Sequence, residues 1–234
     1  MAPPLGGGLV PPTVRVAIVL AIAAALAGNS SPGRLGDLLH EPLSPGHLVA
    51  AVACEAALGA TMAFGLNLAF AVFTFAGRLL DVQVGFGMGQ VFDPMTRQQL
   101  PVLSAVFNQL ALIGFFLVDG HHALVRAFAL SVDAVPPGAV WPMEGILVAV
   151  GRQTSQLFSL GFAMAAPIVF CLMLVELGLG VLARNLPQMN TLVVGVPLKI
   201  FAALATLSLL MLLSGPIMVR IYDSAFAMWG SLWR

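Results

Sequence analysis

Long stretches of hydrophobic residues with almost no charge are the feature that most limits what this chain can fold into. A helix needs about 20 apolar residues to cross a bilayer. Hydrophobic residues make up 59% of the 234 residues and charged residues only 9%, against roughly 25% charged in a soluble domain. The sequence therefore predicts an all-α integral membrane protein. The hydrophobic runs lie at residues 16–27, 48–77 (interrupted by Glu55), 100–118, 153–175 and 191–219 (interrupted by Lys199).

Turn-forming residues and prolines interrupt these runs. The stretch Gly28-Asn29-Ser30-Ser31-Pro32-Gly33 ends the first of them, because such residues terminate helices. Pro167 is expected to kink the fourth run, and Pro197 to bend or begin the last one. The second run is longer than one span needs, so it is expected to tilt, bend or project from the bilayer. The fold class predicted is thus a set of interrupted and kinked hydrophobic helices.

A glycine-rich segment separates the second and third runs. Alternate glycines followed by Asp-Pro form a poor helix, since Gly costs about 1 kcal/mol and Pro about 3 kcal/mol at an interior position. Backbone without regular hydrogen bonds survives at membrane depth only where it is buried in protein or lines a cavity. The segment therefore predicts a pore, a binding site or a gate. Its candidate residues are Gly85, Phe86, Gly87, Met88, Gly89, Gln90, Phe92, Asp93, Pro94 and Met95.

Charged residues within the hydrophobic runs are the next candidates, because an unpaired charge inside a membrane costs several kcal/mol. Glu55 has small neighbours, which predicts close contact with another helix. We interpret it as a buried hydrogen-bond anchor, the alternative being a proton-sensitive gating carboxylate. Lys199 is expected to form a structural or inter-subunit ion pair. Arg78 and Asp81 are spaced i, i+3, so on a helix they share a face and partly neutralise each other.

Other functions find little support in the composition. A formal net charge of zero gives no indication of nucleic-acid binding. Cys54 and Cys171 lie in apolar runs and are read as small buried hydrophobic residues. His121 and His122 are adjacent, so they point in different directions on a helix, and no second cluster has metal-ligand spacing. We therefore expect no metal, no cofactor and no enzymatic activity.

Short motifs follow one another along almost the whole chain in the order of a known family. They are Pro11-Pro12-Thr13-Val14-Arg15-Val16, Glu55-Ala56-Ala57-Leu58-Gly59, Ala76-Gly77-Arg78-Leu79-Leu80-Asp81-Val82-Gln83-Val84-Gly85-Phe86, Phe92-Asp93-Pro94, Pro101-Val102-Leu103, Gly120-His121-His122, Pro136-Pro137-Gly138, Ala165-Ala166-Pro167, Gly178-Leu179-Gly180, Arg184-Asn185-Leu186-Pro187-Gln188-Met189-Asn190 and Gly195-Val196-Pro197-Leu198-Lys199. In this order they resemble the FliR family, export-gate membrane components of the bacterial flagellar type III secretion system.

The resemblance implies an architecture and a set of partners. Residues 1–145 would form a FliP-like helical part and residues 146–234 a FliQ-like helical hairpin, packed with FliP-like, FliQ-like and FlhB-like proteins in a helical hetero-oligomer. This assembly would lie in the bacterial inner membrane, at the flagellar basal body. Unfolded flagellar subunits would pass through its centre, and residues 85–99 would plug the closed pore. The family has a further hydrophobic helix before the stretch matching residues 4–11, where this chain begins.

Two alternatives remain open from the sequence. One is the SctT component of virulence-associated injectisomes, which resembles FliR and shares its mechanism but exports other cargo. The other is a transporter of small solutes or ions, in which interrupted helices form a substrate site near the middle of the membrane. Such transporters often contain internally repeated halves, and no repeat is recognisable in this sequence.

Overall fold

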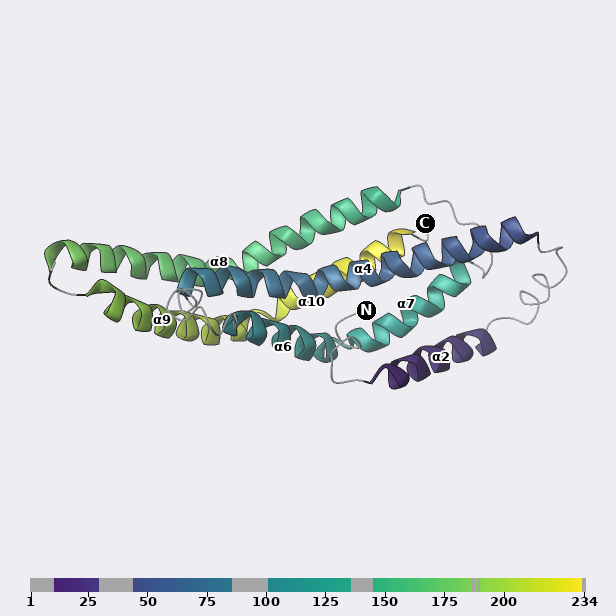
Figure 1. Ribbon diagram of the computed structural model, residues 1–234, viewed down its shortest axis with the longest axis horizontal. Helices are drawn as coiled ribbons and strands as arrows, with labels where there is room; N and C mark the ends of the chain where they lie inside the picture. Colours follow the sequence, from purple (N-terminus) through teal and green to yellow (C-terminus); the bar gives the residue numbers. More distant parts are fainter. Residues whose placement is uncertain are drawn as a thin grey trace, which may run out of the picture. The chain divides into compact units, whose positions relative to one another are not determined.

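The computed structural model describes residues 11–29, 44–85, 101–135, 145–186, 188 and 190–232, and these ranges contain α-helices and turns but no strand. This confirms the predicted all-α fold. Figure 1 shows the helices in sequence colours. They are α2 (Pro12–Asn29), α4 (Pro45–Val84), α6 (Val102–Leu117), α7 (Gly120–Ala134), α8 (Ile146–Asn185), α9 (Thr191–Leu213) and α10 (Gly215–Leu232).

Several of these helices are long and apolar enough to cross a membrane. Among the described residues they are α4, α8 and residues 193–211 of α9, and α6 with α7 adds a fourth span if that bent pair counts as one. α4 and α8 have 40 residues each, which corresponds to about 60 Å of helix. The hydrocarbon core of a bilayer is only about 30 Å thick. These two helices therefore exceed one upright span. The length of the second hydrophobic run predicted this for α4 but not for α8.

The helix boundaries follow from local sequence chemistry. Pro12 and Pro45 are the first residues of α2 and α4, where the missing N–H of proline costs nothing. Ser44 accepts a hydrogen bond from the His47 N–H with its Oγ at 3.2 Å, and so caps α4. At the other end of α4, Gly85 has φ of 92°, and its N–H bonds to the Asp81 carbonyl at 3.2 Å. Glycine adopts this left-handed conformation without strain and ends the helix there.

Two helices were not predicted as such. The mixed polar stretch after residue 118 contains α7, and the last hydrophobic run is divided at Ser214, after which α10 continues to Leu232. The buried residues of α10 include Ile221, Tyr222, Ala225, Met228 and Trp229, which repeat at helical spacing along one face. A helix with one buried face carries polar residues on the other, so neither helix appears as an uninterrupted hydrophobic run. Pro167 and Pro197 lie within α8 and α9, which both continue past them.

The chain divides into two compact units that do not follow its linear order. Unit 1 combines residues 1–69, 115–155 and 222–234, and unit 2 combines residues 70–114 and 156–221. Each unit takes segments from both sides of the boundary expected at residues 145 and 146. A division into FliP-like and FliQ-like parts concerns relationship to other proteins and stays a prediction.

Each unit has its own buried core. In unit 1 the core includes Met62, Leu66, Phe115, Tyr222 and Trp229, each at most 1% exposed. Gln153 on α8 lies within this core, and its Nε2 donates to the Gly65 carbonyl of α4 at 3.1 Å. The core of unit 2 includes the buried residues Phe73, Leu80, Phe107, Ile168 and Leu172. The described helices thus bury part of their apolar residues against one another within each unit.

Candidate functional site

The predicted plug lies mostly outside the described residues. Gly85 is described and ends α4. Outside the described residues lie Phe86, Gly87, Met88, Gly89, Gln90, Phe92, Asp93, Pro94 and Met95. What the structure does describe is the pair of helix ends on either side, where α4 ends at Val84 and α6 begins at Val102. This junction, which lies within unit 2, is the candidate functional site.

Asp81 joins the two helix ends. Its Oδ1 accepts a hydrogen bond from the Leu103 N–H at 2.8 Å. Its Oδ2 accepts from the Ser104 N–H at 3.0 Å and from the Ser104 hydroxyl at 2.7 Å. The Asp81 residue is only 7% exposed. The carboxylate is therefore buried and accepts hydrogen bonds from three donors of α6.

These hydrogen bonds cap the N-terminus of α6. The first backbone N–H groups of a helix have no partner within it, and a side chain at the N-cap position normally accepts from the second or third of them. In α6 the position before the first residue is Pro101, whose side chain has no acceptor. Asp81 supplies the missing acceptor from α4, and its negative charge at a helix N-terminus is also favourable.

Small residues bring the two helices into close contact beside this cap. A Cβ atom at Gly77 would lie 2.5 Å from the Cα and 2.9 Å from the N of Ser104, so only glycine fits. Further along, the Thr74 hydroxyl donates to Asn108 Oδ1 at 2.7 Å. Residues 74, 77 and 81 are spaced by three and four, so they share one face of α4. That face of α4 contacts the first turns of α6.

In the structure, Asp81 binds residues of α6 and not Arg78, its predicted partner. Spacing of i, i+3 suggested that Arg78 and Asp81 neutralise each other. The Asp81 carboxylate is instead bound to α6, while Arg78 lies on the exposed surface of α4. Glu55 is also exposed, on the part of α4 that belongs to unit 1.

Lys199 forms an ion pair within the chain. Its Nζ lies 2.5 Å from Oε1 of Glu176, and the two side chains are 22% and 43% exposed. The pair connects α9 with the part of α8 in unit 2, two segments that run side by side in Figure 1. At the same hairpin, a Cβ atom at Gly195 would lie 3.2 Å from Leu179 Cδ1. Lys199 is therefore a structural link of the hairpin.

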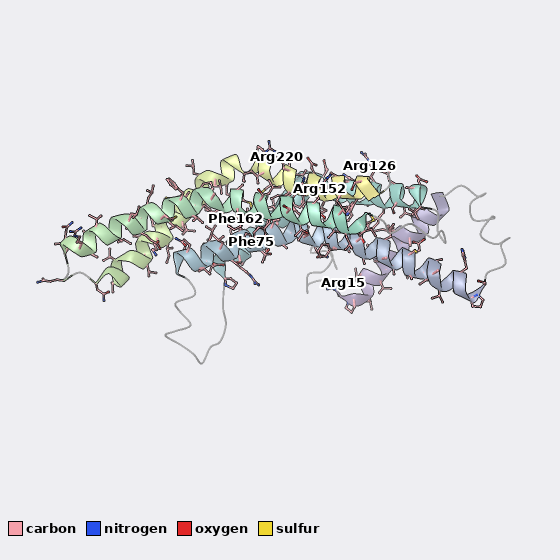
Figure 2. The ribbon with its side chains drawn as sticks, turned by 90° about the horizontal axis from the view of Figure 1, so that it is seen from above. Arg15, Phe75, Arg126, Arg152, Phe162 and Arg220 are labelled. Atoms are coloured by element: carbon pink, nitrogen blue, oxygen red, sulfur yellow. The ribbon has the colours of Figure 1, made fainter. Side chains whose placement is uncertain are left out.

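Three phenylalanines join α4 to α8 in unit 2. The Phe75 ring lies 4.9 Å from that of Phe158 and 5.2 Å from that of Phe162, measured between centroids. Figure 2 shows Phe75 beside Phe162. Phe158 and Phe162 are about half exposed (55% and 47%). The cluster therefore packs α4 on α8 and also leaves an apolar surface that faces outward.

A polar cluster at the bend between α6 and α7 was missed by the sequence analysis. Adjacent histidines were expected to diverge, but the ring centroids of His121 and His122 are 4.1 Å apart. Nδ1 of His122 lies 3.4 Å from Oδ1 of Asp119, whose φ of 54° turns the chain at the bend. In the described part of the chain no fourth ligand residue joins these three, whereas structural zinc sites have four.

Comparison with known proteins decides the family. The sequence profile of the family described as "Bacterial export proteins, family 1" matches residues 1–227. The chain belongs to this family. The match covers both compact units, and it confirms the resemblance on which the sequence analysis relied.

Some of the similar proteins are named as flagellar biosynthetic proteins and others as surface presentation or secretion proteins. The chain is 33% identical to the flagellar biosynthetic protein FliR of Bacillus subtilis over 149 residues, which are 62% of this chain and 58% of that protein. It is 31% identical to FliR of Pectobacterium carotovorum over 169 residues, 72% of this chain and 65% of that protein. The chain thus spans less than two thirds of the length of these two relatives. The surface presentation of antigens protein SpaR of Shigella flexneri is 26% identical over 86% of this chain and 76% of SpaR.

Proposed function

We propose that this chain is a membrane subunit of a bacterial type III protein-export gate. The observation that carries the proposal is the family match over residues 1–227. The described helices support it, since at least three of them are long and apolar enough to span a membrane. In this role the chain is passive. It forms part of a pore through which unfolded subunits cross the inner membrane, and the energy comes from elsewhere in the machine.

The need for partner proteins follows from where α8 exposes apolar side chains. Leu147 is 88% exposed near one end of α8, and Val181 is 63% exposed near the other. These positions are separated by about 50 Å of helix, whereas lipid covers only about 30 Å. The exposed apolar positions of α8 are therefore spread over more helix than one upright span covers. FliP-like, FliQ-like and FlhB-like subunits are the partners that we propose to cover them.

Flagellar subunits are the cargo that we favour. The relatives named as flagellar biosynthetic proteins are 26–33% identical, and two of them reach 33% and 31%. SpaR and the secretion system apparatus protein SsaT of Salmonella typhimurium reach 26% and 27%. An injectisome subunit of the SctT type is the second candidate, supported by the same matches.

Within this function we assign residues 85–99 to the plug of the closed pore. The support is the sequence of the segment, which is unsuited to a helix, and the junction on either side of it. Asp81 binds the first turn of α6, so the two ends of the segment are fixed close together. The glycines of the segment are suited to a plug that must change its backbone conformation.

Valine at Gly87 or Gly89 is expected to reduce export of flagellar subunits severalfold, because a β-branched side chain restricts the backbone of the plug. Secreted subunit would be measured in a strain that lacks the chromosomal gene and carries each variant on a plasmid. Gly28→Val is the matched control, since a Cβ atom at Gly28 meets nothing within 4 Å. Normal assembly with wild-type export in both loop variants would remove the plug assignment. Wild-type export by the strain without the gene would remove the export function itself.

A further inference from the structure

Unit 1 contains a cavity that is separate from the candidate functional site in unit 2. Its volume is about 180 Å³, and it is partly open to the surface. It lies among α2, α7 and the parts of α4 and α10 that belong to unit 1. The lining residues are Arg15, Ile18 and Val19 of α2, Gly59, Met62, Ala63 and Leu66 of α4, Leu124 and Phe128 of α7, and Trp229 of α10.

The lining is apolar except at one point. Met62, Leu66 and Trp229 form buried walls, each 1% exposed. Arg15 is the only charged residue of α2, and it lies in the first turn of that helix, where Figure 2 labels it. Ile18 and Val19 follow one turn further along the same helix. The cavity therefore has a cationic side chain at one place and hydrocarbon walls elsewhere.

We propose that this cavity binds a phospholipid, with part of one acyl chain between the helices and the phosphate beside Arg15. An apolar cavity of about 150 Å³ stays dry and takes up apolar molecules of the size of benzene, so a cavity of this size accepts a segment of an acyl chain. An arginine guanidinium binds phosphate oxygens through charge-assisted hydrogen bonds. An anionic head group joined to a hydrocarbon chain matches both parts of the lining. In a membrane such lipids surround the protein.

The lipid would also have a structural effect. α2 is a short apolar helix, and Val16, Val19 and Leu20 on it are more than half exposed. An acyl chain in the cavity would contact α2, α4 and α7 together, and it would add dispersion contacts that an empty space does not provide. Binding is therefore expected to stabilise α2 against the rest of unit 1.

A photoactivatable lipid tests the proposal directly. Phosphatidylglycerol with a diazirine in the middle of one acyl chain would be mixed into vesicles containing the full chain in its native complex. After irradiation, mass spectrometry would locate the adducts. We expect adducts at Met62, Leu66 or Leu124, because Met62 and Leu66 are too buried for bulk lipid to reach. Arg15→Gln is expected to raise the lipid fraction needed for labelling about tenfold, as for the loss of one charge-assisted hydrogen bond.

Filling the cavity provides the matched comparison. A Cβ atom at Gly59 meets nothing within 4 Å, and neither does one at Gly151. Of these two glycines, only Gly59 lines the cavity. Gly59→Leu should therefore lower cavity adducts severalfold, while Gly151→Leu leaves them unchanged. Ala63→Leu fills the same space if Gly59→Leu does not fold. Adducts confined to exposed residues such as Val16 and Val49 would overturn the proposal. So would equal cavity labelling in folded filled and control variants.

Discussion

Replacing Asp81 with alanine is expected to destabilise the protein by about 3 kcal/mol. The change leaves three donors of α6 without their acceptor: the N–H groups of Leu103 and Ser104 and the Ser104 hydroxyl. A buried donor without a partner costs about 1–3 kcal/mol, and loss of a helix cap costs about 0.5–2 kcal/mol. Thermal unfolding of the purified complex, followed by tryptophan fluorescence, would measure the loss.

A graded series separates the cap from general damage. Ser104→Ala removes one of the three bonds and keeps the capped backbone, so it should cost about 1 kcal/mol. Asp81→Asn keeps the shape but presents an NH₂ group to one donor, so it should fall between Ser104→Ala and Asp81→Ala. Hydrogen exchange at the amides of Leu103 and Ser104 should accelerate in the same order. If all three variants unfold at the wild-type temperature, Asp81 is not the cap of α6.

Alanine at Gly77 is expected to be nearly as harmful, with a loss of about 3 kcal/mol. The new Cβ atom would lie 2.5 Å from the Ser104 Cα, so the backbone of α6 must move. A backbone atom yields much less easily than the end of a flexible side chain. The shift would also lengthen the bonds from Asp81, which lies one turn further along the same face of α4. Thermal unfolding and the yield of assembled complex would measure the effect.

Gly59→Ala on the same helix is the control for this substitution. It adds the same methyl group where nothing lies within 4 Å. Because alanine favours a helix over glycine by about 1 kcal/mol, Gly59→Ala should be neutral or slightly stabilising. Equal stability of the Gly77 and Gly59 variants would mean that α4 and α6 do not approach each other as closely as the structure shows.

The hydrophobic helices could be predicted from the sequence because their signal is local. The turn residues that begin at Gly28 placed the end of α2 to within two residues, since the helix ends at Asn29. The uncharged runs gave the central parts of α4, α6, α8 and α9. Uniform hydrophobicity requires no knowledge of what packs against the helix, and turn residues end it whatever the rest of the chain does.

The helices that were missed depend on one-sided burial. In α10, Arg220 and Asp223 interrupt the hydrophobic pattern, while Tyr222 and Trp229 on the other face are buried. In α7 the two histidines, Arg126 and Asp133 have the same effect. Periodicity at i, i+3 and i+4 is the signal that would have found both helices.

The partner of Asp81 could not be read from its neighbours in the sequence. Spacing on a helix shows which residues share a face, but not which other helix lies against that face. The atoms that Asp81 binds belong to residues 22 and 23 positions further along. One clue was present: Pro101 lies at the start of the third hydrophobic run, so a helix starting after it has no local side-chain cap. A buried helix start without a cap needs an acceptor from elsewhere.

The most direct test of the export-gate proposal is to purify the tagged chain together with the FliP-like and FliQ-like proteins of the same cell, and to measure the mass of the intact complex. Because α8 exposes apolar side chains along its length, we expect the chain expressed alone to be unstable or to aggregate. We predict a stable complex that contains one copy of this chain together with several copies of both partners. A chain that associates with neither partner, and behaves as a monodisperse monomer or self-contained oligomer in mild detergent, would contradict the account.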